Sequence, residues 1–301
     1  MFFTTFRSIT ELFILVLIGY IMFKKGLIGK DGIRSMNSIL IHLSVSALML
    51  RSFQSDMLWN NASALVYGIG YSFLFQLTLI GLSFILIRKN AEDASVDRSC
   101  IAFNNVGFIA MPVIGAVFGD MGVFYASCSV FVFNIVFWII GMGPIMMTGE
   151  RSAEMVKKNL FSDRTLVTVI AALLLIFKIR LPEIIMSPVN YLSSLNAPIA
   201  MINTGCIIAS CDIRAVVSKR VIQVSFLRLV VSSLLCCLLL RFVIRDDLTF
   251  RSFALMASCS TGSFIPILAE QYDKNAARAS GCFLVTTLGC IITMPLMMLL
   301  F

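Results

Sequence analysis

Long apolar runs alternate with short polar stretches along the whole chain. A helix that crosses a bilayer needs about 20 mainly apolar residues, and by hydropathy ten runs come near that length. We therefore expect an all-α integral membrane protein whose ten membrane-spanning helices leave no space for a sizeable soluble domain. The expected spans lie near residues 9 to 23, 33 to 53, 63 to 87, 99 to 119, 122 to 147, 164 to 180, 187 to 210, 219 to 241, 249 to 270 and 277 to 300.

Composition supports a membrane protein, since 59% of the 301 residues are hydrophobic and 13% are charged. The net charge of +8 comes from short basic clusters between apolar runs, so we interpret it as a topology signal rather than a nucleic-acid surface. If the N-terminus is outside, most of the 24 Lys and Arg residues fall in inner loops. The sequence thus predicts a cell-membrane protein with both termini outside and a basic cytoplasmic loop at 148–163.

That loop divides the chain into two halves of five spans, 1–147 and 164–301. Five is an odd number, so the second half must enter the membrane from the side opposite to the first, as an inverted repeat. Arg98 precedes Pro112 by nearly the same distance as Arg251 precedes Pro266. Chance alignment is the alternative, because proline and glycine are common in membrane helices.

The stretch "FNNVGFIAMPVIGAVFG" at 103–119 places two asparagines, three glycines and a proline inside an apolar run. Unpaired peptide groups are costly in hydrocarbon, so such interruptions persist where protein groups or a water-filled cavity satisfy the backbone. Interrupted spans in corresponding places of two halves indicate a transporter's midplane site. We expect spans four and nine to be broken and to cross there as antiparallel partners.

Each break would expose the N-terminal end of a second half-helix, which attracts an anion through its free N–H groups and partial positive charge. Neutral side chains would add hydrogen bonds without a permanent buried charge. The candidates for these bonds are Asn104, Asn105, Ser260, Thr261 and Ser263.

Other polar residues within the predicted spans have two interpretations each. Arg228, in span eight, would either contact a carboxylate or tie to backbone carbonyls. Asn196 and Asn203, spaced by two helical turns in span seven, would either line the pathway or join helices by hydrogen bonds, and Asn134 in span five is similar. His42, the single histidine, would either relay a proton or pack as a neutral ring.

Several functional classes lack the residues that they need. Glu11 is the acidic residue that falls well within a span, which disfavours sodium or proton exchange as the main activity. The sequence contains no Walker-type phosphate loop, dinucleotide fingerprint or zinc helix motif, so an ATP-driven pump or an enzyme is disfavoured. The cysteines lack paired metal-ligand spacing and are interpreted as small packing residues. We expect no cofactor and no metal.

The segments "NNVGFIAMPVIGAVFG" and "FVFNIVFWIIGMGP" resemble the signature of the auxin efflux carrier family, in which asparagine, glycine and phenylalanine precede a proline. The C-terminal "PILAEQYDKNAARASGCFLVTTLGCIITMPL" is similar to that family's ending. The resemblance extends over essentially the whole chain. The family includes plant auxin exporters and bacterial permeases proposed for malate and malonate.

The resemblance implies ten helices in a crossover fold similar to the bile-acid symporters and sodium/proton antiporters. Spans 1, 2, 6 and 7 would form a scaffold, and spans 3 to 5 and 8 to 10 a moving transport domain. By motif position, Asn104, Asn105, Gly107 and Pro112 would form the first crossing, and 260–266, with Gly262 and Pro266, the second. The family often has proline in the second span and early in the ninth. This chain has Ser46 and Ser260-Thr261 at those places, so we expect its substrate or its hinge to differ.

These observations predict a secondary transporter that moves a small organic anion, such as a dicarboxylate or an aromatic carboxylate, by alternating access. A channel-like or sensory membrane protein on the same fold is the alternative. The expected partners are the anion and membrane lipid, with no nucleic acid, and the resemblance allows a homodimer.

Overall fold

The computed structural model describes residues 2–54, 63–89, 91–139, 163–210, 212 and 216–301. Within these residues the fold is helical, apart from one isolated β-bridge. The expectation of an all-helical protein is confirmed for this part of the chain. The predicted end of span five and all but the last residue of the predicted loop at 148–163 lie outside the described residues.

The first half of the chain contributes α-helices and three short π-helical segments. They are α1 (Phe2–Lys24), α2 (Lys30–Ile39), η1 (Leu40–Ser44), α3 (Val45–Phe53), α5 (Ser63–Leu86), α6 (Ala94–Ala102), η2 (Val106–Ala110), α7 (Met111–Asn134) and η3 (Ile135–Ile139). The second half contributes α10 (Asp163–Ile176), α11 (Glu183–Ser194), α12 (Asn196–Ser210), α14 (Lys219–Phe226), η4 (Leu227–Ser232), α15 (Ser233–Arg241), α16 (Asp247–Ser258), α17 (Ile265–Gln271) and α18 (Ala276–Leu300).

Six helical runs in the described residues are long and apolar enough to cross a bilayer. They are Lys30–Phe53, Ser63–Leu86, Val106–Phe137, Glu183–Ser210, Lys219–Arg241 and Ala276–Leu300. The predicted spans at 99–119 and 249–270 do not form single helices, because non-helical residues divide each of them. The predicted span at 9–23 lies within α1, and most of the predicted span at 164–180 lies within α10.

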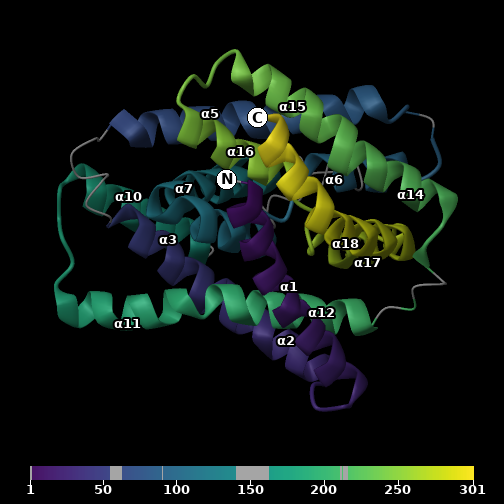
Figure 1. The fold of residues 1–301 in the computed structure, drawn as a ribbon, viewed down its shortest axis with the longest axis horizontal. Coiled ribbons are helices and arrows are strands. Elements are labelled where there is room, and N and C mark those ends of the chain that lie inside the picture. The colour runs from purple at the N-terminus through teal and green to yellow at the C-terminus, as the bar shows by residue number, and fades with distance from the viewer. Residues whose placement is uncertain (1, 55–62, 90, 140–162, 211, 213–215) are drawn as a thin grey trace.

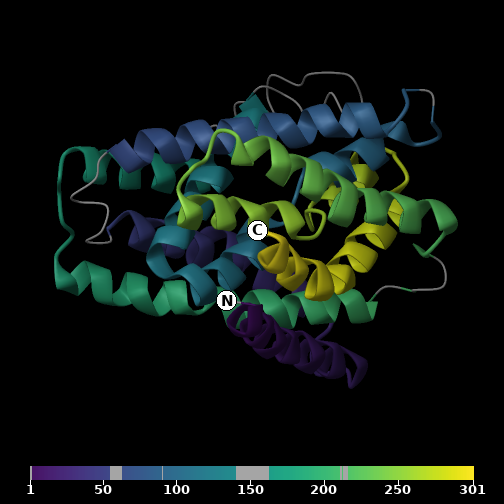
Figure 2. The ribbon, with the colours of Figure 1, turned by 45° about the horizontal axis from the view of Figure 1, so that its top comes forward.

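Long helices frame the two broken ones (Figure 1). In Figures 1 and 2, α5 and the α14–α15 run extend along one long edge, and α11 and α12 follow each other along the opposite edge. The middle of the fold contains α7 and α16, which contact each other. The site described below therefore lies inside the protein and is enclosed by helices.

Helices α1 and α12 pack with their backbones almost touching. A Cβ atom added at Gly205 would collide with the Val16 carbonyl oxygen, and one added at Gly19 would collide with the Ile202 carbonyl oxygen. The Cys206 thiol also donates to the Gly19 carbonyl at 3.2 Å. Small residues allow this close approach, which gives membrane helices much of their packing energy.

Helix α7 contains a kink at Gly119, whose φ of 61° and ψ of −152° are not helical. Glycine tolerates a positive φ because it has no Cβ. The kink falls at the predicted boundary between spans four and five. The two parts of α7 on either side of Gly119 are therefore not one straight helix.

Candidate functional site

Two helices are interrupted inside the fold. Helix α6 ends at Ala102, and the chain becomes helical again at Val106. Helix α16 ends at Ser258, and α17 begins at Ile265. The first interruption is shorter than the resemblance implied and lies earlier in the chain, because Gly107 is already within η2 and Pro112 lies in the first turn of α7. Proline is tolerated in the first turn of an α-helix, where the N–H that it lacks would have no acceptor within that helix.

The two interruptions pair with each other as an antiparallel bridge between Asn104 and Thr261. The Asn105 N–H donates to the Ser260 carbonyl at 2.9 Å, and the Gly262 N–H donates to the Phe103 carbonyl at 2.9 Å. A backbone that leaves the helix inside a membrane must find such partners. The expected antiparallel crossing is thus present, and each broken helix satisfies the other.

Side chains bind the carbonyl groups left free where α6 and α16 end. The Asn104 amide donates to the Met256 carbonyl at 2.8 Å, and the Thr261 hydroxyl donates to the Cys100 carbonyl at 2.9 Å. On α5, the Gln76 amide donates to the Ala102 carbonyl at 3.0 Å. These bonds replace the missing intrahelical partners of the last turns. Asn104 and Thr261 therefore hold the crossing together.

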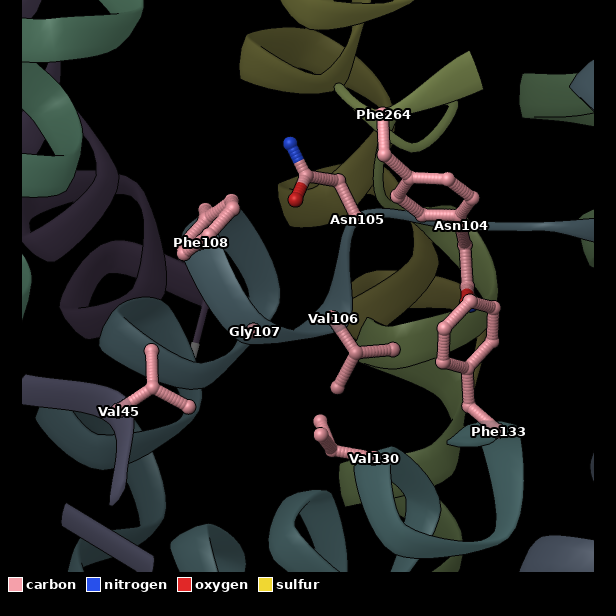
Figure 3. Close-up of a pocket in the computed structure, with 9 residues that line it drawn as sticks. All are labelled: Val45, Asn104, Asn105, Val106, Gly107, Phe108, Val130, Phe133 and Phe264. Carbon is pink, nitrogen blue, oxygen red and sulfur yellow. The ribbon is translucent and has the colours of Figure 1, made fainter. Parts of the chain in front are cut away.

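A cavity of about 60 Å³ lies beside the crossing. It is lined by Val45, Asn104, Asn105, Val106, Gly107, Phe108, Val130, Phe133 and Phe264 (Figure 3). Figure 3 shows the Asn105 side chain directed between Phe108 and Phe264, whereas Asn104 points toward Phe133. The Asn105 side-chain nitrogen is buried and has no hydrogen-bond partner among the described residues. It is a free donor at the wall of a mostly apolar cavity.

This arrangement presents hydrogen-bond donors to a group bound in the cavity. The continuous helical run from Val106 begins at the cavity, and the first turn of a helix presents N–H groups that lack intrahelical acceptors. The lining residues include no Asp or Glu. A carboxylate oxygen would accept hydrogen bonds from the Asn105 amide and from N–H groups of this first turn.

Arg228 is fully buried in η4 and lies behind the crossing rather than in the cavity lining. Its Nη1 atom donates to the Ala257 carbonyl at 2.7 Å, and the Ser233 hydroxyl donates to the same oxygen at 2.7 Å. Nε and Nη2 have no hydrogen-bond partner among the described residues. The tie to a backbone carbonyl is present, and the positive charge remains beside the C-terminal end of α16.

A larger hollow of about 390 Å³ adjoins the crossing, between α2, α12, α17 and α18. The predicted residues Ser263 and Pro266 line it, as do Lys30 and Arg34 at the start of α2. Phe108 and Phe264 line both this hollow and the smaller cavity. The two spaces are therefore neighbours with shared aromatic walls.

A third hollow, of about 270 Å³, lies near the kink of α7 and includes Pro112 and Asn196 in its lining. The Asn196 side chain is buried, and neither its oxygen nor its nitrogen has a partner among the described residues. At this hollow, Arg51 Nη2 and Asp120 Oδ1 are 3.3 Å apart and join α3 to α7.

The remaining predicted residues lie outside these three linings. Asn134 and Ser46 are buried, and their side-chain polar atoms lack partners among the described residues. Asn203 donates to the Asn37 side-chain oxygen at 2.7 Å, which joins α12 to α2 as a polar contact between helices. His42 is at an exposed position of η1.

Sequence reasoning missed Gln76, the paired phenylalanines and a buried acid. Phe108 and Phe264 follow Gly107 and Gly262 closely in the sequence. This closeness to the helix breaks is the sequence feature that could have identified them as site residues. Asp97 is fully buried in α6 and bonds Arg220 at 2.8 Å. The span predicted at 99–119 excludes Asp97, because the polar residues around it give no hydropathy signal for the start of the broken helix.

Comparison with known proteins agrees with this architecture. The family described as "Membrane transport protein" matches residues 4–298. A protein named "Uncharacterized transporter" from Methanothermobacter thermautotrophicus is 23% identical over 300 residues, which cover 96% of each chain. The chain is thus a multi-pass membrane protein of a transport family. It belongs to the membrane transport protein family, the auxin efflux carrier family that its fourth-span motif resembles.

Proposed function

We propose that the protein is a secondary transporter that moves a small organic anion across the cell membrane by alternating access. The anion's carboxylate would bind at the crossing, with Asn105 as the main side-chain donor. The observation that carries this proposal is the buried, unpartnered Asn105 amide on the wall of the cavity between two paired, broken helices. Asn104, Ser260, Thr261 and Gly262 would shape the site by maintaining the crossing.

An inverted repeat of five plus five helices accounts for the crossing. We shift the residue numbers of the first-half helices by the number of residues that separates Asn104 from Thr261. After this shift, α5 coincides in sequence with the α14–α15 run, and the α2–α3 run coincides with the α11–α12 run. The reciprocal hydrogen bonds of the bridge are those that a two-fold relation between the halves would produce. The same separation brings α6 onto α16 and α1 onto α10.

The transport domain would contain α5 to α7 and α14 to α18, and the scaffold α1 to α3 and α10 to α12. The hollows of about 390 Å³ and about 270 Å³ both lie between scaffold helices and a broken helix of the transport domain. Movement of the transport domain past the scaffold would open one hollow and close the other, so that the crossing faces each side in turn. By the positive-inside rule, the hollow with Lys30 and Arg34 is the cytoplasmic one.

Substrate charge follows from the composition of the site. Acidic residues are missing from the cavity lining, so a bound cation would find no carboxylate there. Arg228 places a buried positive charge close to the crossing, which favours an anion over long range even without contact. No cofactor enters this mechanism, because translocation involves no bond making.

Counterflow in proteoliposomes tests the proposal. Vesicles preloaded with unlabelled malonate or benzoate should accumulate the labelled acid when they contain the wild-type protein, and uptake should saturate. Asn105→Ala should abolish both effects. Asn190→Ala removes an exposed amide from α11 and should leave uptake unchanged. Flux that neither saturates nor shows counterflow would overturn the carrier mechanism in favour of a channel.

A further inference from the structure

The hollow between α2, α12, α17 and α18 carries a positive charge that the crossing cavity itself lacks. Lys30 and Arg34 are four residues apart on α2, so they lie on the same helix face. The rest of the lining is neutral and includes Asn37, Ser210 and Ser280. Among the described residues, the lining includes no Asp or Glu.

The acid nearest to these cations along α2 lies outside the lining and is almost fully exposed to solvent. Arg34 Nη1 is 3.4 Å from Asp31 Oδ1, but the two side chains are 83% and 96% exposed. Ion pairs this open to water contribute little and are screened by salt. In the third hollow, by contrast, Arg51 is paired with Asp120 on the opposite wall. The two hollows therefore differ in the charge that they present to an entering anion.

The basic hollow also lies on a route to the crossing. Phe108 and Phe264 line it on one side and line the small cavity on the other. Asn105 points between these two rings (Figure 3). An anion held near Lys30 would thus have the aromatic pair between itself and the free amide of Asn105.

We propose that this hollow is an anion-capture site, distinct from the crossing cavity, in which Lys30 and Arg34 bind a carboxylate before it passes Phe108 and Phe264. The inference rests on the proposed function and adds a second binding position to it. Convergent positive charge in a hollow with low-dielectric walls concentrates anions and raises their association rate. The capture should therefore depend strongly on ionic strength, since the Debye length falls from about 30 Å at 0.01 M to about 3 Å at 1 M.

Calorimetric titration of the purified full-length protein with malonate, and separately with benzoate, tests the capture site. At low salt, the double variant Lys30→Gln/Arg34→Gln should bind about tenfold more weakly than wild type, at the lower end of electrostatic focusing effects. At high salt the two proteins should bind equally. The control Lys25→Gln/Lys274→Gln removes the same charge from exposed positions outside the lining and should behave as wild type.

Three results would overturn the proposal: wild-type affinity in the double variant at every salt concentration, equal weakening in the control, or wild-type protein that binds neither acid in a salt-dependent way. Asn105→Ala separates this site from the crossing. The variant should lose counterflow but keep the salt-sensitive binding that needs Lys30 and Arg34. Loss of that binding in Asn105→Ala would show that no separate capture site exists. In the wild-type protein, absent counterflow together with intact salt-sensitive binding would contradict the proposed function alone.

Discussion

Asn104 and Asn105 are adjacent in the chain, yet their side chains serve opposite purposes. The Asn104 amide is bonded to the Met256 carbonyl on the other broken helix, whereas the Asn105 amide nitrogen has no partner among the described residues and faces the cavity. One residue joins the two halves of the chain. The other is available to a ligand.

This difference predicts that the two alanine variants fail in different ways. Asn104→Ala removes a buried hydrogen bond and leaves the Met256 carbonyl with only the long 3.5 Å bond from the Cys259 N–H, so it should lower the free energy of unfolding by about 0.5–1.5 kcal/mol. Asn105→Ala should leave the melting temperature unchanged while it abolishes counterflow. Thermal unfolding in detergent, measured beside proteoliposome uptake, checks both. Equal destabilisation by the two substitutions would contradict the assignment.

Arg228→Met should raise the substrate concentration required for half-maximal transport without lowering thermal stability. The substitution removes a buried charge with two unpartnered nitrogens, and the Ser233 hydroxyl still binds the Ala257 carbonyl. Replacing poorly compensated buried charges by apolar side chains is often neutral or stabilising. A lower melting temperature with unchanged concentration dependence would assign Arg228 a purely structural role.

Gly205→Ala should destabilise the protein, because its Cβ would collide with the α1 backbone at Val16. We expect the free energy of unfolding to fall by about 1–3 kcal/mol, as is typical of overpacking. Gly70→Ala on α5 is the matched control, since a Cβ there meets nothing within 4 Å. It should be neutral or slightly stabilising through its helix propensity. Detergent melting curves distinguish the two, and equal curves would show that the contact between α1 and α12 is not tight.

Cross-linking Arg51→Cys to Asp120→Cys with a flexible bifunctional thiol reagent should arrest transport. The two native side chains approach to 3.3 Å, with one on the proposed scaffold and the other on the proposed transport domain. Relative movement of these domains is required by alternating access, so a covalent link between them should stop turnover. Each single variant, treated in the same way, serves as the control. Full activity of the cross-linked protein would argue against domain movement at this contact.

The interruption of two membrane-spanning runs could be predicted from the sequence, because helix-breaking residues inside an apolar run have few explanations in a membrane. An antiparallel meeting of the two interruptions was expected from the same reasoning, since interrupted backbones need partners, but the pairing of Asn104 with Thr261 emerges only in the structure. The bounds of the first break could not be predicted. Gly107 lies within η2 and Pro112 at the start of α7, so both are compatible with a helix, and hydropathy does not reveal that the backbone leaves the helix at Phe103.

Side-chain direction was also beyond the sequence. No local pattern distinguishes Asn104 from Asn105, because the partner of the Asn104 amide is the Met256 carbonyl, at a separation of 152 residues along the chain. Asp97 was misjudged for a similar reason. Its burial depends on Arg220, which is 123 residues distant and approaches only in the folded protein.

Each half of the polypeptide supplies hydrogen-bond partners to the broken helix of the other half. These bonds join Phe103 to Gly262 and Asn105 to Ser260. Expressed alone, either half would present bare peptide groups to lipid at the middle of its broken helix. The gene can be divided within the segment that joins the halves. Each fragment should then be degraded when expressed alone, and both should persist when they are expressed together. Co-expression in the cell therefore tests the bridge itself.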